Sequence, residues 1–272
     1  MDEAVQEKLC NTTMQTITAI AKLPVIKVDR EVFLRKQFAK SPYLEQIVAN
    51  GPPSVYKAES LRKKAEEIVK NCTAKTSMAS FIAGIPANPA VMVAAGGIDI
   101  AQYFGFAVNM AQQIAYLFGE DNLFDGDADE LSDSAKIRIV AYMGAMLGAS
   151  GAAALIAKTS QRVGLQLGKQ VANRALTKTV WYPLVKKVAA FIGQKITKKT
   201  VEKTITKAMP LVGGVVSGGL TYVTFRPMGN RLTDVFVRNL NGEFNAMDDE
   251  MELNPDFLKN VAVEAAEVVE VQ

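Results

Sequence analysis

The sequence contains no histidine, and this absence removes much familiar enzyme chemistry. Histidine is the commonest general base, the usual partner of a nucleophilic serine or cysteine, and a frequent metal ligand. An enzyme made from this chain would have to use Asp, Glu, Lys or Tyr, and the spacing of those residues singles out no catalytic set. We therefore expect a protein that is not an enzyme and that carries no cofactor and no metal.

Cysteine is almost as scarce. Cys10 and Cys72 lie far apart in the sequence and belong to no CxxC motif, which favours reduced, structural thiols. The opening residues, MDEAVQEKLC, show no basic stretch followed by an apolar stretch, so they do not resemble a secretory signal. The expected location is cytoplasmic, and because of the charge pattern described next it is peripheral on the inner face of the cell membrane.

Charge is unevenly distributed along the chain, although its net value is only +3. Between residues 158 and 207 the sole acid is Glu202, whereas acidic residues gather at 120–133 and from 243 onward. The cations of this section are Lys158, Arg162, Lys169, Arg174, Lys178, Lys186, Lys187, Lys195, Lys198, Lys199, Lys203 and Lys207. Such a distribution suggests that one face of the protein meets an anionic surface.

Apolar residues recur at helical spacing through most of the chain, which predicts an all-α fold, a compact multi-helix bundle with Gly/Ala-rich apolar central helices and one Lys-rich amphipathic helix. We expect early helices over residues 2–21, 31–40 and 54–71, the second of them capped by Asp29. Asn50-Gly51-Pro52-Pro53 is a clear break. It suggests three parts: an N-terminal helical extension (1–53), a main helical domain (54–245) and an acidic C-terminal tail (246–272).

The uncharged run after residue 99 carries a polar stripe at helical spacing. Its members are Asp99, Gln102, Asn109 and Gln113. Buried polar groups need hydrogen-bond partners, so the stripe predicts a buried polar network between helices. The acidic loop that follows, residues 120–133, does not have the glycine of a calcium loop in its required place, and we expect a solvated loop that caps the next helix through Ser132 or Ser134.

Small residues recur four apart in two further uncharged stretches, which predicts close helix packing. In the first, residues 139–157, they are Gly144, Gly148 and Ala152, and in the second, residues 208–225 between Lys207 and Arg226, they are Gly213, Gly214, Gly218 and Gly219. A helix of roughly 20 residues can cross a bilayer. However, the many Ala and Gly residues of 139–157 leave the free energy of membrane insertion near zero. Packing in a protein core explains the same residues.

Residues 184–209 place apolar side chains on one helical face and lysines largely on the other. This pattern fits an amphipathic helix on an anionic membrane or acidic partner, and equally a surface helix with a solvated lysine face. The residues of the expected surface are Trp181, Lys186, Lys187, Lys195, Lys198, Lys199, Lys203 and Lys207. Nucleic acid is not the expected partner, because the stretch has few aromatic residues and no recognised binding motif.

Three segments together resemble the EcsC family of bacterial proteins. They are IPANP at 85–89 leading to Asp99-Ile100, QIAYLFG at 113–119, and ITKAMPLVGG at 205–214 with Gly218, Gly219 and Tyr222. The resemblance covers roughly residues 55 to 240 and is carried by glycines, prolines and apolar runs. The family is named after a gene that accompanies an ABC transporter, and the resemblance implies no catalytic activity. The first helices and the acidic tail depart from the family pattern.

Three functions follow from these observations. The leading hypothesis is a non-enzymatic, membrane-associated accessory protein, linked to transport or envelope processes, which binds an anionic membrane surface or an acidic membrane protein through its lysines. The second is a pore-forming protein that converts from a soluble bundle to an inserted form. The third is a carrier of a hydrophobic small molecule, oriented by Asp99, Gln102 and Asn109. The sequence does not specify an oligomeric state.

Overall fold

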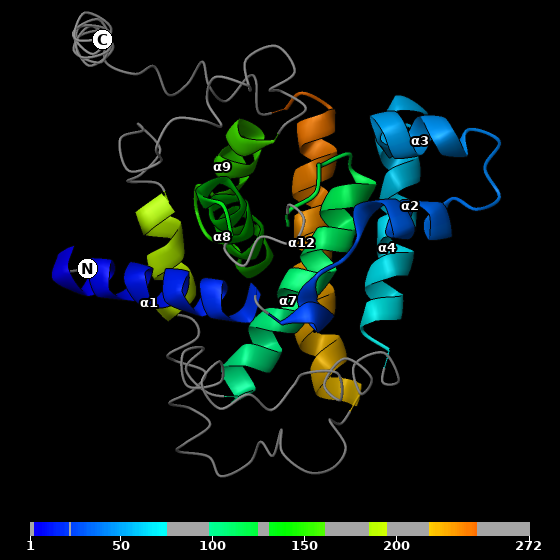
Figure 1. Ribbon diagram of the computed structural model, residues 1–272. Helices are drawn as coiled ribbons and strands as arrows, with labels where there is room; N and C mark the ends of the chain where they lie inside the picture. Colours follow the sequence, from blue (N-terminus) through cyan, green and yellow to red (C-terminus); the bar gives the residue numbers. More distant parts are fainter. Residues whose placement is uncertain are drawn as a thin grey trace, which may run out of the picture.

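The computed structural model describes residues 3–21, 23–74, 98–124, 131–160, 185–194 and 218–243. Within these ranges every regular element is helical, which confirms the expected all-α fold (Figure 1). The elements are α1 (Glu3–Ala21), the 3-10 turn η1 (Pro24–Ile26), α2 (Arg30–Gln37), α3 (Leu44–Asn50), the 3-10 turn η2 (Pro52–Ser54), α4 (Ala58–Cys72), α7 (Ile98–Leu117), α8 (Asp133–Leu147), α9 (Ala152–Thr159) and α12 (Gly218–Leu240). Residues 185–194 form a further helix.

Helix α7 lies at the centre of the bundle. It packs against α1, α2, α4, α8 and α12, and in Figure 1 it runs beside α12 with α4 on one side and α1 and α8 on the other. After Asp99 the helix has no charged residue, so it can be buried on nearly all sides. Phe104, Met110 and Ile114 are accordingly almost inaccessible to solvent.

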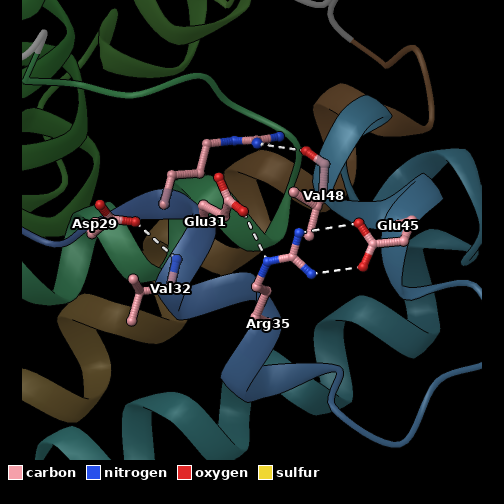
Figure 2. Close-up of polar contacts among 7 residues, drawn as sticks. Asp29, Glu31, Val32, Arg35, Glu45 and Val48 are labelled. Carbon is pink, nitrogen blue, oxygen red and sulfur yellow. Dashed lines mark hydrogen bonds and ion pairs between the residues drawn. The ribbon is translucent and has the colours of Figure 1, made fainter.

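The first helices form much as their local signals predict. Asp29 caps α2 by accepting a hydrogen bond from the Val32 N–H at 2.8 Å (Figure 2). Arg35 of α2 donates to Glu31 at 2.8 Å and to both carboxylate oxygens of Glu45 on α3, at 2.7 and 3.0 Å. These bonds lower the pKa of the Glu45 carboxyl. The surface ion pairs therefore fix the short helix α3 beside α2.

Two helix boundaries differ from the sequence prediction. α2 ends at Gln37 instead of residue 40, and residues 38–40 form a turn in which the Ser41 N–H donates to the Phe38 carbonyl at 2.8 Å. Pro42 has no N–H with which to continue the helix from that carbonyl. α4 begins at Ala58 instead of residue 54, because Pro52–Ser54 form the 3-10 turn η2. The buried face of α4 consists of Leu61, Ala65, Ile68 and Val69, whereas Val55, at the start of the expected helix, precedes the observed one and is half-buried.

The expected boundary at residue 53 does not separate two cores. Ile17 of α1, Leu34 of α2 and Ile47 of α3 are fully buried in the same hydrophobic cluster as Leu61 of α4 and Phe104 of α7. The reason is that α1 and α2 pack directly on α7, which supplies apolar surface on several sides. The N-terminal helices are therefore part of the bundle, and the tail at 246–272 lies outside the described residues.

The uncharged run at 139–157 does not form one helix. α8 ends at Leu147 and α9 begins at Ala152, and both Gly148 (φ 78°) and Gly151 (φ 88°) adopt left-handed backbone angles. Such angles terminate a helix, and glycine adopts them without steric cost. Among the helices that the structure describes, none combines the length and the apolar character of a membrane span.

Candidate functional site

The lysine surface is described only at its beginning. Lys187 is exposed and Lys186 is half-buried on the helix of residues 185–194. The other residues expected there lie outside the described part of the chain: Trp181, Lys195, Lys198, Lys199, Lys203 and Lys207.

The apolar face of this helix is packed inside the protein. Val185, Val188 and Ile192 are at most 2% exposed. On the α1 side, the Thr13 hydroxyl donates to the Ala189 carbonyl at 3.0 Å, and a Cβ added at Gly193 would lie 3.0 Å from the Leu9 carbonyl oxygen. The apolar residues at the start of the predicted amphipathic helix therefore face α1 and α8, and the lysine at 187 faces solvent.

The glycines expected to pack helices behave in different ways. Gly144 of α8 faces the helix of residues 185–194 so closely that an added Cβ would collide with Cγ1 of Val188 and lie 3.0 Å from the Cβ of Ala152. Gly148 is not a packing residue: an added Cβ would meet nothing within 4 Å, and its left-handed angle caps α8. Gly218 and Gly219 begin α12, whereas Gly213 and Gly214 lie outside the described residues.

A glycine that the sequence analysis did not select lies where α12 packs closely on α4. A Cβ at Gly229 would lie 2.6 Å from Cγ2 of Val69 on α4 and 3.3 Å from the sulfur of Met110 on α7. Arg62 of α4 also pairs with Asp234 of α12 beside this contact. Gly229 stands alone in its stretch of sequence, so the small-residue repeat could not reveal it.

Part of the predicted polar stripe forms a buried network with the turn η1. Asn109 donates to the carbonyls of Val25 and Ile26 at 3.2 and 3.3 Å, and Gln113 donates to Asn109 at 2.9 Å. The central member is Gln112, which the prediction omitted. It is fully buried, donates to the Ile26 carbonyl at 2.7 Å and accepts from the Val28 N–H at 3.0 Å.

Gln102 does not join this network. It is 8% exposed, and its Oε1 accepts no hydrogen bond from the residues that the structure describes. Asp99 lies in the first turn of α7, and the placement of its side chain is outside the described part of the structure. The Asn109 side chain donates to the backbone of η1, so its amide is already engaged within the bundle.

A second polar cluster, which the sequence analysis missed, lies where the chain leaves α7. The Glu120 side chain is buried, 2% exposed. Its Oε1 accepts from the Ser160 hydroxyl at 2.5 Å and its Oε2 accepts from the Tyr142 hydroxyl at 3.1 Å. Burial is the main cause that raises the pKa of Glu120, and the bonds from Ser160 and Tyr142 and the positive charge of Arg138 oppose it. Burial and the adjacent carboxyl also raise the pKa of Tyr142.

Two arginines donate hydrogen bonds to backbone carbonyls where the chain leaves α7. Arg138 of α8, 2% exposed, donates to the carbonyls of Asp121 and Asn122 at 3.3 and 3.1 Å. Arg30 of α2 donates to the Glu120 carbonyl and to the Val48 carbonyl of α3, both at 2.9 Å. The Tyr116 hydroxyl accepts from the Leu123 N–H at 3.1 Å, and burial raises the pKa of Tyr116 to about 12. Five helices therefore meet at the end of α7.

One feature of the sequence points to this cluster. Glu120 directly follows Gly119 at the end of an uncharged helix, and the acids after it made the whole stretch look solvated. The rest of the expectation for this loop is confirmed at its far end, where the Ser132 hydroxyl caps α8 by accepting from the Ala135 N–H at 3.2 Å. Among the described residues no group of three or more potential ligands could hold a metal ion.

Comparison of the chain with protein-family models, with curated proteins and with solved structures gave no match.

Proposed function

We propose that this protein is a non-enzymatic accessory protein, of the kind that its resemblance to the EcsC family implies, which binds the anionic inner surface of the cell membrane. The observation that carries the proposal is the composition of residues 158–207, which contain twelve cationic residues and a single acid, Glu202. Each cation near an anionic leaflet contributes about 1 kcal/mol, so a few of them acting together suffice for binding.

The packing of residues 185–194 supports an electrostatic mode of binding. An interfacial helix normally buries its apolar face in the headgroup region. Here Val185, Val188 and Ile192 are buried against the protein, while Lys187 is exposed. This part of the section can offer charge to a membrane but little apolar surface, so binding through it should weaken strongly as salt is added.

The test is flotation of the protein with lipid vesicles over a series of salt concentrations. One set of vesicles is phosphatidylcholine, and the other adds phosphatidylserine. We expect binding to the anionic set only, with release by salt. The variant Lys195→Gln, Lys198→Gln, Lys199→Gln, Lys203→Gln loses four of these charges, and its affinity should fall by up to about a thousandfold.

A matched variant controls for net charge. Lys36, Lys40, Lys63 and Lys70 are exposed and belong to α2, to the turn after it and to α4. Replacing these four lysines by glutamine removes the same charge and should leave binding nearly unchanged. Equal binding to both kinds of vesicle, or equal losses in the two variants, would refute the proposal. Release of a dye trapped in the vesicles would instead favour the pore-forming function.

A further inference from the structure

Glu120 is the one buried acidic side chain among the residues that the structure describes. It connects three helices: it lies three residues after the end of α7, it accepts a hydrogen bond from Tyr142 of α8, and it accepts another from Ser160, the residue that ends α9. α9 has only 8 residues and packs its buried Leu155 and Ile156 on the bundle beside α8, and the bond from its C-cap residue Ser160 ties its end to Glu120.

The charged and titratable groups around this carboxyl come from every neighbouring element. They are Arg138 and Tyr142 of α8, Asp121 in the loop, Tyr116 of α7 and Arg30 of α2. Yet within the described part of the chain no cationic nitrogen lies within 4.0 Å of the Glu120 carboxylate, because Arg138 and Arg30 direct their bonds at backbone carbonyls. A buried carboxylate without an ion pair is costly, and taking up a proton relieves that cost.

We propose that Glu120 is a proton-controlled latch: with its proton it holds the end of α9 against α7 and α8, and when the proton leaves for solvent this joint loosens so that the carboxylate becomes hydrated. This device goes beyond the proposed function, since it requires no membrane. The cationic section begins on α9 at Lys158, two residues before Ser160, so the latch lies at the start of the segment that the proposed function uses.

The direction of the pH effect follows from where the proton binds. Burial raises the pKa of Glu120 in the closed joint, and in the opened joint the exposed carboxyl has its ordinary pKa. Between these two values the closed form holds one more proton than the open form. The opening constant therefore rises with pH, by at most about tenfold per pH unit, and levels off above the pKa of the closed form. Below the ordinary pKa of the carboxyl group, the opening constant does not change with pH.

Hydrogen exchange of the whole protein tests this directly. Protection of the α9 amides, corrected for the intrinsic exchange rate at each pH, should fall as pH rises and then level off. The α4 amides serve as an internal reference, because the described residues that bond to Glu120 or act on its charge lie on α2, on α7, on α8, at the end of α9 and in the loop after α7. In Glu120→Gln the side chain cannot ionise, and the slope for α9 should disappear. A flat profile in the unmodified protein, or the same slope in Glu120→Gln, would overturn the proposal.

A pair of milder variants tests the same point in case Glu120→Gln does not fold. Tyr142→Phe removes a donor that favours the carboxylate, so the pH at which protection levels off should move upward. Tyr116→Phe removes a buried hydroxyl that contacts Leu123 instead of Glu120, and it should leave that pH in place. If the pH at which protection levels off did not shift in Tyr142→Phe, or shifted equally in both variants, Glu120 would not be the titrating group.

Discussion

The contact between Gly144 and Val188 allows a sharp test of how the lysine-bearing helix is seated. Gly144 lies in the last turns of α8, and a methyl group there would collide with Val188 and press on Ala152. Overpacking of this kind costs about 1–3 kcal/mol, while alanine gains about 1 kcal/mol over glycine in a helix. Gly144→Ala should therefore destabilise the protein by about 0–2 kcal/mol net.

The collision can be relieved by shortening its partner. Val188 is completely buried, so Val188→Ala alone removes about two buried carbon atoms and lowers the stability by about 1.6 kcal/mol. In the double variant the new methyl occupies part of the space that Val188 leaves. We therefore expect the two losses not to add, with a coupling of about 1–2 kcal/mol in favour of the double variant. Urea denaturation of the unmodified protein, the two single variants and the double variant measures this coupling.

Gly148 provides the matched control, four residues further along the same chain. Gly148→Ala should cost about 1–2 kcal/mol because of its left-handed backbone, not because of crowding. Its cost should thus be the same with or without Val188→Ala. Strict additivity of Gly144→Ala and Val188→Ala would refute the reasoning, because it would mean that the helix of residues 185–194 does not rest on α8.

Two further predictions concern polar groups. Gln112→Leu would leave the Val28 N–H without its partner, whereas the Ile26 carbonyl keeps its bond from Asn109, so thermal denaturation should show a loss of about 1–3 kcal/mol for one unpaired group. Gln113→Leu, which contacts only one side chain of this network, should cost less than about 1 kcal/mol, and a reversed order would contradict the assignment. Asp29→Ala should cost about 1 kcal/mol through loss of the α2 cap, and Asp29→Asn, which keeps an acceptor, should cost much less in the same assay.

Local signals were sufficient where a few neighbouring residues decide the structure. The Asp29 and Ser132 caps each depend on one side chain and one backbone N–H three residues away, so the sequence alone locates the first and narrows the second to Ser132 or Ser134. The buried stripe of α4 was also predictable, because it follows from helical periodicity in a charged segment.

The features that were mispredicted depend on contacts between distant residues. A pair of glycines four apart looks the same whether both lie on a packed face or one ends the helix, so Gly144 and Gly148 could not be told apart. Likewise, helical spacing grouped Gln102 with Asn109, but the position of η1 decides that Gln112 is the buried partner and that Gln102 has none at Oε1.

The same reasoning separates the residues that complete the fold from those that are left for function. Neighbouring helices bury the apolar face of residues 185–194. The turn η1 accepts hydrogen bonds from the amides of Asn109 and Gln112. Among the described residues, the groups that the fold does not fully satisfy include exposed lysines such as Lys187, whose charge is balanced from outside, and the Glu120 carboxyl, whose burial is balanced by hydroxyl groups but by no ion pair. Since selection for stability alone would favour apolar residues at a site like Glu120, these groups are where function should be sought first.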